Sequence, residues 1–293
     1  MCLLFGHGLH RAGALPALTP VSFYLNLSLG QLSVAGPVTE LVSSRALCGR
    51  RCCEREQIMR VLVIGGCGFI GSHIVDKLLS SGHSVRVFDR NPEKFRRQLK
   101  NVEYFFGDIK DRMAVIESLA DVEVVMHLVS TTFPGTANLD PVADVRDNLL
   151  ATLNLLDSMV QSGVSRLVYL SSGGTVYGIP DQIPTPESHP LRPINSYGIV
   201  KAAIENYIGL FQREKAISPI IIRPSNPFGP RQGHTGVQGV VTTFLNRILR
   251  KETIEIWGDG TVVRDYLYVD DLARLCVTAA TSSGANLTLG ARA

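Results

Sequence analysis

The stretch from Met59 to Asp89 constrains the fold more than any other part of the sequence. An apolar segment, 61–64, leads into the glycine-rich sequence GGCGFIG at 65–71 and then into a helical pattern at 72–80. A second apolar segment, 85–88, stops at Asp89. This order of strand, glycine turn, helix, strand and acid is typical of a dinucleotide-binding βαβ unit.

The glycine turn predicts how a dinucleotide would be held. The early glycines let the backbone turn sharply, one in mid-loop lets a pyrophosphate approach, and the last lets the helix pack close to the sheet. The first N–H groups of the helix and its dipole favour an anion. We therefore predict a set of phosphate-side contacts. These are Gly65, Gly68, Phe69, Ile70 and Gly71.

Asp89 predicts which dinucleotide binds. A carboxylate at the tip of the second strand accepts hydrogen bonds from both ribose hydroxyls, and its charge repels a 2′-phosphate. NAD is therefore favoured over NADP, although Arg90 beside it leaves the second cofactor open.

Composition excludes several classes of protein. The net charge of +3 gives no strong attraction to nucleic acid or to a membrane surface. No apolar run approaches the roughly 18 residues of a membrane-spanning helix. The six cysteines fit no zinc spacing and no disulfide framework, so we expect no metal site and a reducing, cytoplasmic location.

The first 58 residues differ from the rest of the chain. They show no strand or helix period, and they contain no acid before Glu40. A transit peptide is one interpretation. We favour an unstructured or upstream extension, because Met59 directly precedes the first strand.

Strands and helices alternate from residue 59 onward. We expect strands at 61–64, 85–88, 102–106, 122–128, 166–170 and 219–222, and helices at 72–80, 92–100, 112–119, 142–161 and 196–212. This alternation predicts an α/β fold, a doubly wound parallel sheet of the Rossmann type, with ligands at the carboxyl ends of the strands.

The pattern loosens after residue 223. A glycine-rich loop precedes a predicted helix at 240–249, short strands at 254–257 and 266–269, and a helix at 270–280. We expect an NAD-binding Rossmann domain at 59–223. Residues 224–293 would form a partial substrate-binding region interleaved with the last sheet elements, in which Trp257 is a packing residue.

Tyr197 and Lys201 are four residues apart and would share one face of helix 196–212. A solvated helix face could show the same spacing. Here the pair follows SSGGTVYG at 171–178 and the earlier glycine turn, and it precedes RPSNP at 223–227 and VRDY at 263–266. In this order the motifs resemble the extended short-chain dehydrogenase/reductase family. The likeness covers residues 59 to about 290 and is closest to its UDP-sugar 4-epimerases.

The resemblance implies a mechanism. Tyr197 would take a proton from a sugar hydroxyl while hydride passes to NAD, and the 4-keto sugar would turn over and receive the hydride on its other face. A phenol of ordinary pKa, about 10, needs lowering by about 3 units to act as a base near neutral pH. Two positive charges would lower the pKa of Tyr197, those of Lys201 and of the nicotinamide ring. Lys201 would also hold the nicotinamide ribose.

Further positions carry over by match. They are Asp108 and Ile109 at the adenine, Leu128 and Ser130 in the cofactor groove, Asn148, Ser171 and Pro224 in the cofactor site, and Asn226 and Arg264 on the sugar nucleotide. For Arg264 the alternative is a surface ion pair with Asp265 or Asp270.

The resemblance also implies a homodimer built on helices 142–161 and 196–212. Leu149, Leu153 and Leu156 offer an apolar stripe for that contact, and a core-facing stripe is the alternative interpretation.

Two departures from the family pattern bear on function. Gly173 stands at the catalytic Ser or Thr position, so that hydroxyl must come from Ser172, Thr175 or water, or be missing. Gly174 and Thr175 replace the carboxyl residues of dehydratases and decarboxylases, so dehydration is disfavoured. The second departure is length, because the family continues well beyond residue 290. We therefore expect a substrate region truncated at its C-terminus, and the chain is either a fragment or has an incomplete substrate lid.

These observations predict an NAD-dependent nucleotide-sugar epimerase acting at C4 of a UDP-hexose. Two alternatives stay open. One is a nucleotide-sugar or carbonyl reductase of the same fold, and the other is a non-catalytic NAD-binding protein.

Overall fold

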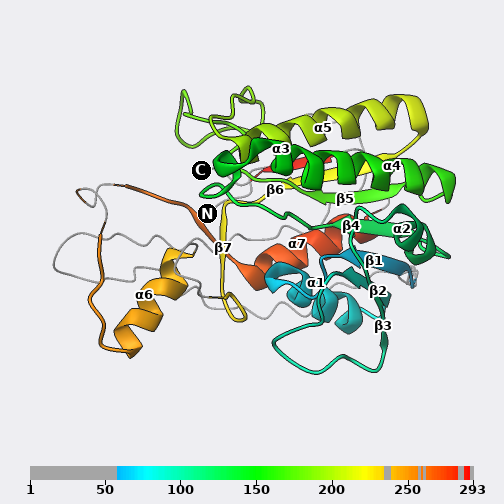
Figure 1. Cartoon of the computed structure of the whole chain (residues 1–293), viewed down its shortest axis with the longest axis horizontal. Helices are drawn as coiled ribbons and strands as arrows, with labels where there is room; N and C mark the ends of the chain where they lie inside the picture. The colour runs from blue at the N-terminus through cyan, green and yellow to red at the C-terminus, as the bar shows by residue number, and fades with distance from the viewer. Residues whose placement is uncertain (1–57, 234–238, 257–258, 260–261, 283–286, 291–293) are drawn as a thin grey trace, which may run out of the picture.

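The computed structural model describes residues 58–233, 239–256, 259, 262–282 and 287–290 (Figure 1). The interpretations of residues 1–57 and of Trp257 lie outside the described residues.

A seven-stranded, wholly parallel sheet forms the centre of the molecule. Its strands lie in the order β3-β2-β1-β4-β5-β6-β9. The strands are β1 Arg60–Ile64, β2 Ser84–Asp89, β3 Val102–Phe106, β4 Val124–His127, β5 Arg166–Leu170, β6 Ser218–Arg223 and β9 Leu287–Gly290. The predicted doubly wound Rossmann sheet is confirmed, and β9 is a seventh strand contributed by the region in which we expected the last sheet elements.

Helices cover both faces of this sheet (Figure 1). On one face lie α1, Phe69–Ser80, and α7, Val269–Thr281; on the other lie α2, Arg112–Ser118, α4, Ala151–Gln161, and α5, Ser196–Lys215. The pleat of β1 explains the double burial, because Val61 and Val63 pack toward α1 and α7 while Leu62 and Ile64 pack toward the opposite helices.

A smaller unit follows β6. The two-stranded parallel sheet of β7, Asn226–Phe228, and β8, Tyr266–Tyr268, lies at the carboxyl end of the main sheet. Helix α6, Val240–Leu249, belongs to the same part of the chain, and none of its residues is buried. The strand predicted at 254–257 is wrong for its described residues, 254–256, which adopt no strand.

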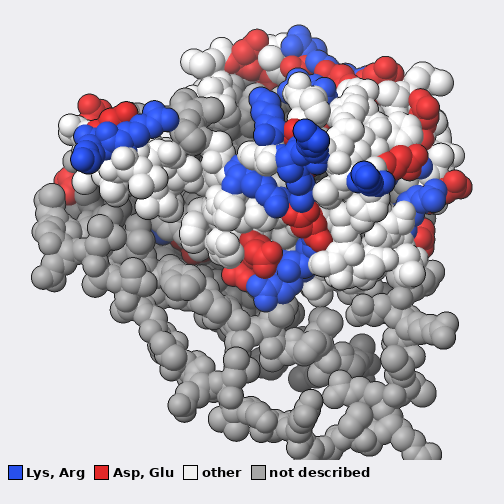
Figure 2. All heavy atoms as spheres, turned by 90° about the horizontal axis from the view of Figure 1, so that it is seen from below, with Lys and Arg blue, Asp and Glu red and all other residues white. Residues whose placement is uncertain are grey.

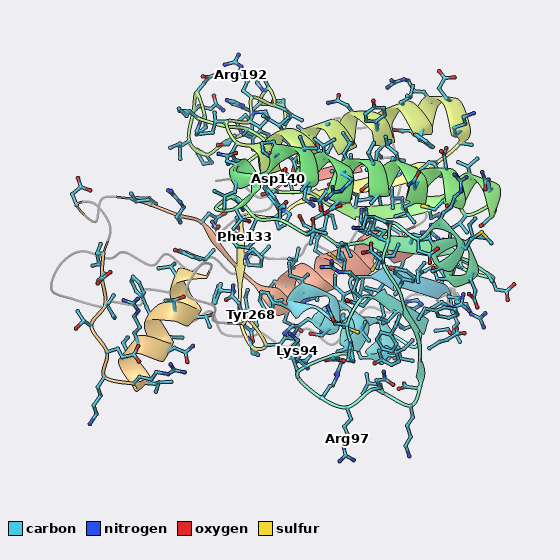
Figure 3. All side chains as sticks on the ribbon, in the orientation of Figure 1. Lys94, Arg97, Phe133, Asp140, Arg192 and Tyr268 are labelled. Carbon is cyan, nitrogen blue, oxygen red and sulfur yellow. The ribbon has the colours of Figure 1, made fainter. Side chains whose placement is uncertain are left out.

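The helix predicted at 92–100 is also wrong, because this segment is irregular. Its apolar residues are too few to bury a helical face, and Phe95 remains exposed. Ion pairs hold the segment instead. Arg96 contacts Asp76 of α1 as well as Glu93, while Arg97 extends away from the molecule (Figure 3).

The helix predicted at 142–161 forms in three pieces. The first is α3, Pro141–Asp144, then comes the π-helix η2, Val145–Leu150, and then α4. A short 3₁₀ turn, η1, Ala137–Leu139, precedes them. Such single π turns are frequent at functional sites because they redirect side chains from a helix. Here the wide turn contains Asn148, which the sequence placed in the cofactor site.

Charge is mixed on the surface seen in Figure 2, where Lys and Arg side chains lie directly beside Asp and Glu. This arrangement agrees with the small net charge. Within the described ranges, no helix combines the length and apolarity needed to cross a membrane.

Candidate active site

A cavity of about 830 Å³ opens at the carboxyl ends of the strands. This edge is where open parallel sheets bind their ligands. Its walls come from the glycine turn, the loop after β4, the end of β5, the start of α5, and the segment after β6. The predicted residues on its wall are Gly65, Gly68, Phe69, Ile70, Gly71, Leu128, Ser130, Ser171, Ser172, Thr175, Tyr197, Lys201, Pro224, Asn226 and Arg264.

The glycine turn has the shape that a pyrophosphate requires. Gly65 has a φ of +90°, and a Cβ on Gly71 would lie 2.1 Å from the carbonyl oxygen of Gly65. Gly68 caps α1 without any side-chain hydrogen bond, and the first turn of α1 contains no acid. The first N–H groups of α1 therefore have no side-chain cap competing with a phosphate. These residues fit an NAD molecule.

Asp89 lies at the end of β2, beside the glycine turn. Its Oδ2 accepts a hydrogen bond from the Cys67 amide at 3.0 Å, and its Oδ1 accepts one from the Asn91 amide at 3.2 Å. The carboxylate is thus fixed next to the loop, as the ribose role requires. Asp108 and Ile109 follow β3 on the same edge of the sheet, and neither they nor Asp89 line the cavity itself.

Replacing Asp89 with alanine is expected to weaken NAD binding and to reduce the preference for NAD over NADP. The variant loses two ribose hydrogen bonds and the charge that repels a 2′-phosphate. Calorimetric titration of both cofactors measures this. If Arg90 then pairs with the phosphate, the Asp89→Ala/Arg90→Ala variant should lose the gained NADP affinity. Unchanged NAD affinity and unchanged preference in Asp89→Ala would refute the ribose role.

Helix α5 places Tyr197 and Lys201 at the cavity. Asn195 caps the helix, its Oδ1 accepting from the Gly198 amide at 2.8 Å. The buried Lys201 ammonium donates to the Leu170 carbonyl at 2.8 Å and lies 4.8 Å from the Tyr169 ring centroid. Burial lowers the pKa of Lys201 to about 8, although the negative charges of Glu205 and Asp144 raise it in part.

Burial raises the pKa of Tyr197 to about 12. Hydrogen bonding with the hydroxyls of Ser130 and Ser172 acts in the opposite direction, and the Asp144 charge adds to the rise. The Lys201 ammonium lies 5.8 Å from the centroid of the Tyr197 ring. The hydroxyls of Ser130 and Ser172 therefore lie beside the phenol, and the Lys201 ammonium lies near its ring.

Ser172 and Thr175, the two candidates to replace the hydroxyl that is missing at Gly173, differ in their position relative to the Tyr197 phenol. Ser172 neighbours the Tyr197 phenol, as does Ser130, which the sequence placed only in the cofactor groove. The Thr175 hydroxyl oxygen also lies in the cavity wall region, but it is buried without a hydrogen-bond partner. The arrangement favours Ser172 over Thr175 as the neighbour of the phenol.

The side chains of Asn148 and Asn226 both form hydrogen bonds with the backbone of the protein. Asn148 is buried and does not line the cavity; its Oδ1 accepts from the Thr131 amide at 2.8 Å. The Asn226 side chain lines the cavity and donates to the Asp265 carbonyl at 2.9 Å. The Arg264 guanidinium, also on the wall, donates to the Val263 carbonyl at 2.9 Å.

A buried network that the sequence did not reveal lies beneath the end of β5. Glu205 accepts from the Ser171 hydroxyl and from two guanidinium nitrogens of Arg223, which in turn donates to the Tyr177 hydroxyl at 2.9 Å. Glu205 is four residues beyond Lys201, so the sequence could have placed both on one face of α5. It could not indicate the partners of Glu205, because Ser171 and Arg223 are distant in sequence.

The sequence analysis also missed the wall formed by residues 131–134, although the polar residues that begin three positions after β4 could have indicated it. Phe133 of this wall is labelled in Figure 3. Beneath the wall, His127 is buried and contacts the Thr152 hydroxyl at 2.9 Å. Burial and the Lys201 charge lower the pKa of His127 to about 3, so this imidazole is neutral.

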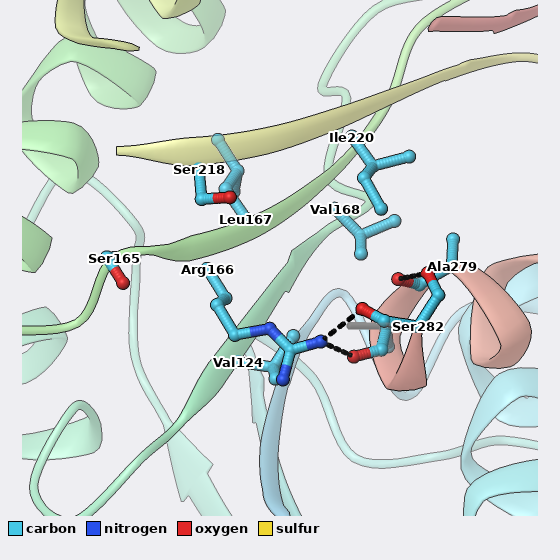
Figure 4. Close-up of a pocket in the computed structure, with 10 residues that line it drawn as sticks. Val124, Ser165, Arg166, Leu167, Val168, Ser218, Ile220, Ala279 and Ser282 are labelled. Atoms are coloured by element: carbon cyan, nitrogen blue, oxygen red, sulfur yellow. Dashed lines mark hydrogen bonds between the residues drawn. The ribbon is translucent and has the colours of Figure 1, made fainter. Parts of the chain in front are cut away.

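A second cavity, of about 310 Å³, lies at the opposite, amino-terminal edge of the sheet (Figure 4). Arg166 crosses it and donates to the carbonyls of Ala280 and Ser282, at 2.6 and 2.9 Å. These are carbonyls at the end of α7, so Arg166 satisfies a helix C-terminus, which is a structural role.

Comparison with known proteins agrees with this geometry. The sequence model of the NAD dependent epimerase/dehydratase family matches residues 61–289. A putative UDP-glucose 4-epimerase of Methanocaldococcus jannaschii is 38% identical over 216 residues, which are 73% of this chain and 71% of the relative. The UDP-glucose 4-epimerase of Mycolicibacterium smegmatis is 35% identical over 240 residues, 77% and 74% of the two chains.

Solved structures share the fold. The UDP-glucose 4-epimerase of Thermotoga maritima, determined with UDP-glucose, superposes with a TM-score of 0.75 at 37% identity, covering 80% of this chain and 77% of that one. The Thermus thermophilus UDP-glucose 4-epimerase, determined with NAD, gives 0.74 at 35% identity, covering 80% and 78%. The match over most of the chain, together with the glycine turn and the Tyr197–Lys201 pair, shows that this protein belongs to the NAD-dependent epimerase/dehydratase family and uses NAD as its cofactor.

Proposed function

We propose that this protein interconverts UDP-hexoses by epimerisation at C4, with Tyr197 as the base. The observation that carries the proposal is the grouping of the Tyr197 phenol with Ser130, Ser172 and Lys201 on one wall of the cavity that begins at the glycine turn. The relatives named UDP-glucose 4-epimerase support the substrate class.

Each residue has a part in the proposed reaction. NAD, when bound, supplies the hydride acceptor and donor. Tyr197 takes the proton of the sugar 4-hydroxyl and returns it after the 4-keto sugar has turned over. Ser172 donates a hydrogen bond to the phenol oxygen and stabilises its anion, while Ser130, whose own proton is donated to the Thr132 carbonyl, lies beside the phenol. Lys201 holds the nicotinamide ribose and provides a positive charge near the ring of Tyr197.

The cavity wall argues for epimerisation over water elimination. No Asp or Glu is among the described residues that line the cavity. Dehydration requires a carboxyl group to protonate the departing hydroxyl, and neither Gly174 nor Thr175 provides one. A Cβ on Gly174 would meet no atom within 4 Å, so this part of the wall leaves space in which a sugar could turn.

A panel of nucleotide sugars tests the proposal. We expect purified protein to retain bound NAD and to interconvert UDP-glucose and UDP-galactose with no net consumption of cofactor. Stoichiometric oxidation of added NADH with a keto substrate would instead support the reductase, a class represented among the relatives by a dTDP-4-dehydro-6-deoxyglucose reductase. NAD binding without turnover of any sugar would support the non-catalytic alternative.

We also propose a homodimer through α3, η2 and α5. The stripe of Leu149, Leu153 and Leu156 is not available for that contact. It faces the core, as in the alternative interpretation, because Leu156 is fully buried and Leu149 and Leu153 pack against the buried core. Other apolar side chains of these helices face outward. They are Val142, Val145, Leu150, Ile199, Tyr207 and Leu210.

Light scattering at micromolar concentration should therefore report twice the mass of the chain. Leu210→Glu is expected to give a monomer, because it places a charge in the proposed contact. Leu249→Glu changes an equally apolar, exposed residue on α6 and should leave the dimer intact. A monomeric native protein would refute the dimer.

A further inference from the structure

Asp144 lies beneath the active-site wall, and the proposed mechanism assigns no role to its carboxylate. It is the last residue of α3, it is fully buried, and it does not line the cavity. A buried carboxylate is costly unless hydrogen bonds compensate for its lost hydration. Its partners therefore indicate what it does.

Three separate segments donate to the Asp144 carboxylate. The Thr132 hydroxyl and the Asn148 amide nitrogen donate to Oδ1, at 2.7 and 2.8 Å, and the Ser196 hydroxyl donates to Oδ2 at 2.7 Å. Thr132 belongs to the cavity wall after β4, Asn148 to the π turn η2, and Ser196 to the first turn of α5. One side chain thus joins the wall to the helix that contains the base.

The two joined segments both reach the cavity wall, one through Ser130 and the other through Tyr197, and these two hydroxyls are neighbours. On the wall, Ser130 donates from its hydroxyl to the Thr132 carbonyl at 3.0 Å, so the position of Thr132 determines that of Ser130. On α5, Ser196 directly precedes Tyr197. Asp144 therefore links the segment that contains Ser130 to the segment that contains Tyr197.

The π turn makes this arrangement possible. Asn148 lies four residues after Asp144, donates to both its carbonyl and its carboxylate, and accepts from the Thr131 amide at 2.8 Å. The wall is consequently held at two adjacent residues, Thr131 and Thr132. An ionised carboxylate only accepts hydrogen bonds and can accept several, which suits a junction of three donors.

We propose that Asp144 is a positioning residue for the proposed epimerisation, holding the wall 130–132 against the first turn of α5 so that the Ser130 hydroxyl meets the Tyr197 phenol. It touches neither substrate nor cofactor and acts through these two residues. This inference rests on the proposed function for its effect on turnover, whereas its effect on local order is independent of activity.

Asp144→Ala removes every acceptor of the junction. We expect kcat for UDP-glucose to fall about 10–100-fold, because small misplacements of catalytic groups have effects of this size, while KM and the Kd of NAD change less than threefold. Asp144→Asn should recover most of the loss, since its amide oxygen can still accept from Thr132 and Asn148 and its nitrogen can donate to Ser196. Asp147→Ala, which changes a more exposed acid on the next turn, is the matched control and should retain full activity.

Two further readouts separate positioning from a merely structural effect. The double variant Asp144→Ala/Ser130→Ala should have the same kcat as Asp144→Ala alone, because both changes remove the same contact between Ser130 and Tyr197. Hydrogen exchange should rise in peptides covering 130–134 and 196–199 of Asp144→Ala, with α1 and β1 unchanged.

The outcomes decide clearly. Wild-type kcat in Asp144→Ala, additive losses with Ser130→Ala, or a uniform rise of exchange over the whole chain would each overturn the inference. If Asp144→Ala fails to fold, Thr132→Val and Ser196→Ala each remove one arm of the junction, and unchanged kcat in both would overturn it. If the native protein converts no UDP-sugar, the proposed function fails, and the local exchange pattern alone then supports or overturns the junction.

Discussion

Tyr197→Phe is expected to lower the rate of UDP-sugar interconversion by about 10²–10⁴-fold, the usual effect of losing a general base. The ring still packs in the wall, so the melting temperature and NAD affinity should stay near their native values. The measurement is a coupled assay of UDP-galactose conversion together with calorimetric titration of NAD.

Tyr207→Phe provides the matched control, because it makes the same chemical change on an outward-facing position of α5. It should leave the rate unaltered. Native turnover in Tyr197→Phe would refute the proposed mechanism, and a different base or the non-catalytic alternative would then account better for the cavity.

Gly71→Ala is expected to abolish measurable NAD binding and to lower the free energy of unfolding by about 3 kcal/mol. The added Cβ would lie 2.1 Å from the Gly65 carbonyl oxygen and 2.7 Å from the Gly66 Cα, both backbone atoms that no side-chain rotation can move away. The glycine turn must therefore shift, and the phosphate cradle shifts with it. Chemical denaturation and NAD titration measure the two effects.

Gly209→Ala is the control for this change. Gly209 lies within α5, where a Cβ would meet only the end of the Arg213 side chain at 3.6 Å. Helix propensity predicts a gain of roughly 0.5–1 kcal/mol there. Equal stability and NAD affinity in Gly71→Ala and the native protein would show that the turn is looser than its geometry indicates.

The parts of the fold that were predictable are those in which neighbouring residues carry the signal. The segment from β1 to Asp89 is continuous in sequence, and its apolar runs, glycines and terminal acid each have a local physical reason. Tyr197 and Lys201 were likewise predictable because four residues bring two side chains to one helical face.

The missed features depend on partners distant in sequence. The segment 92–100 has Pro92 and a charged composition suited to a helix, but its Arg96 pairs with Asp76 on α1 as well as with Glu93, and the partner on α1 cannot be read from the local sequence. The π turn at 145–150 arises where Asn148 and Asp144 engage a wall that the sequence showed only as a loop. The Ser171–Glu205–Arg223 network combines the ends of two strands with a helix, so no single spacing could indicate it.

The place of β9 has a consequence for how the chain is made. This strand pairs with β6, Leu287 opposite Ile220 and Gly290 opposite Arg223, although some 60 residues of chain come between them. During synthesis β6 is consequently an open edge until residues 287–290 have left the ribosome, with its backbone donors and acceptors available to any other strand. Release of a shorter chain leaves that edge unprotected, and self-association of nascent chains through β6 is the resulting hazard.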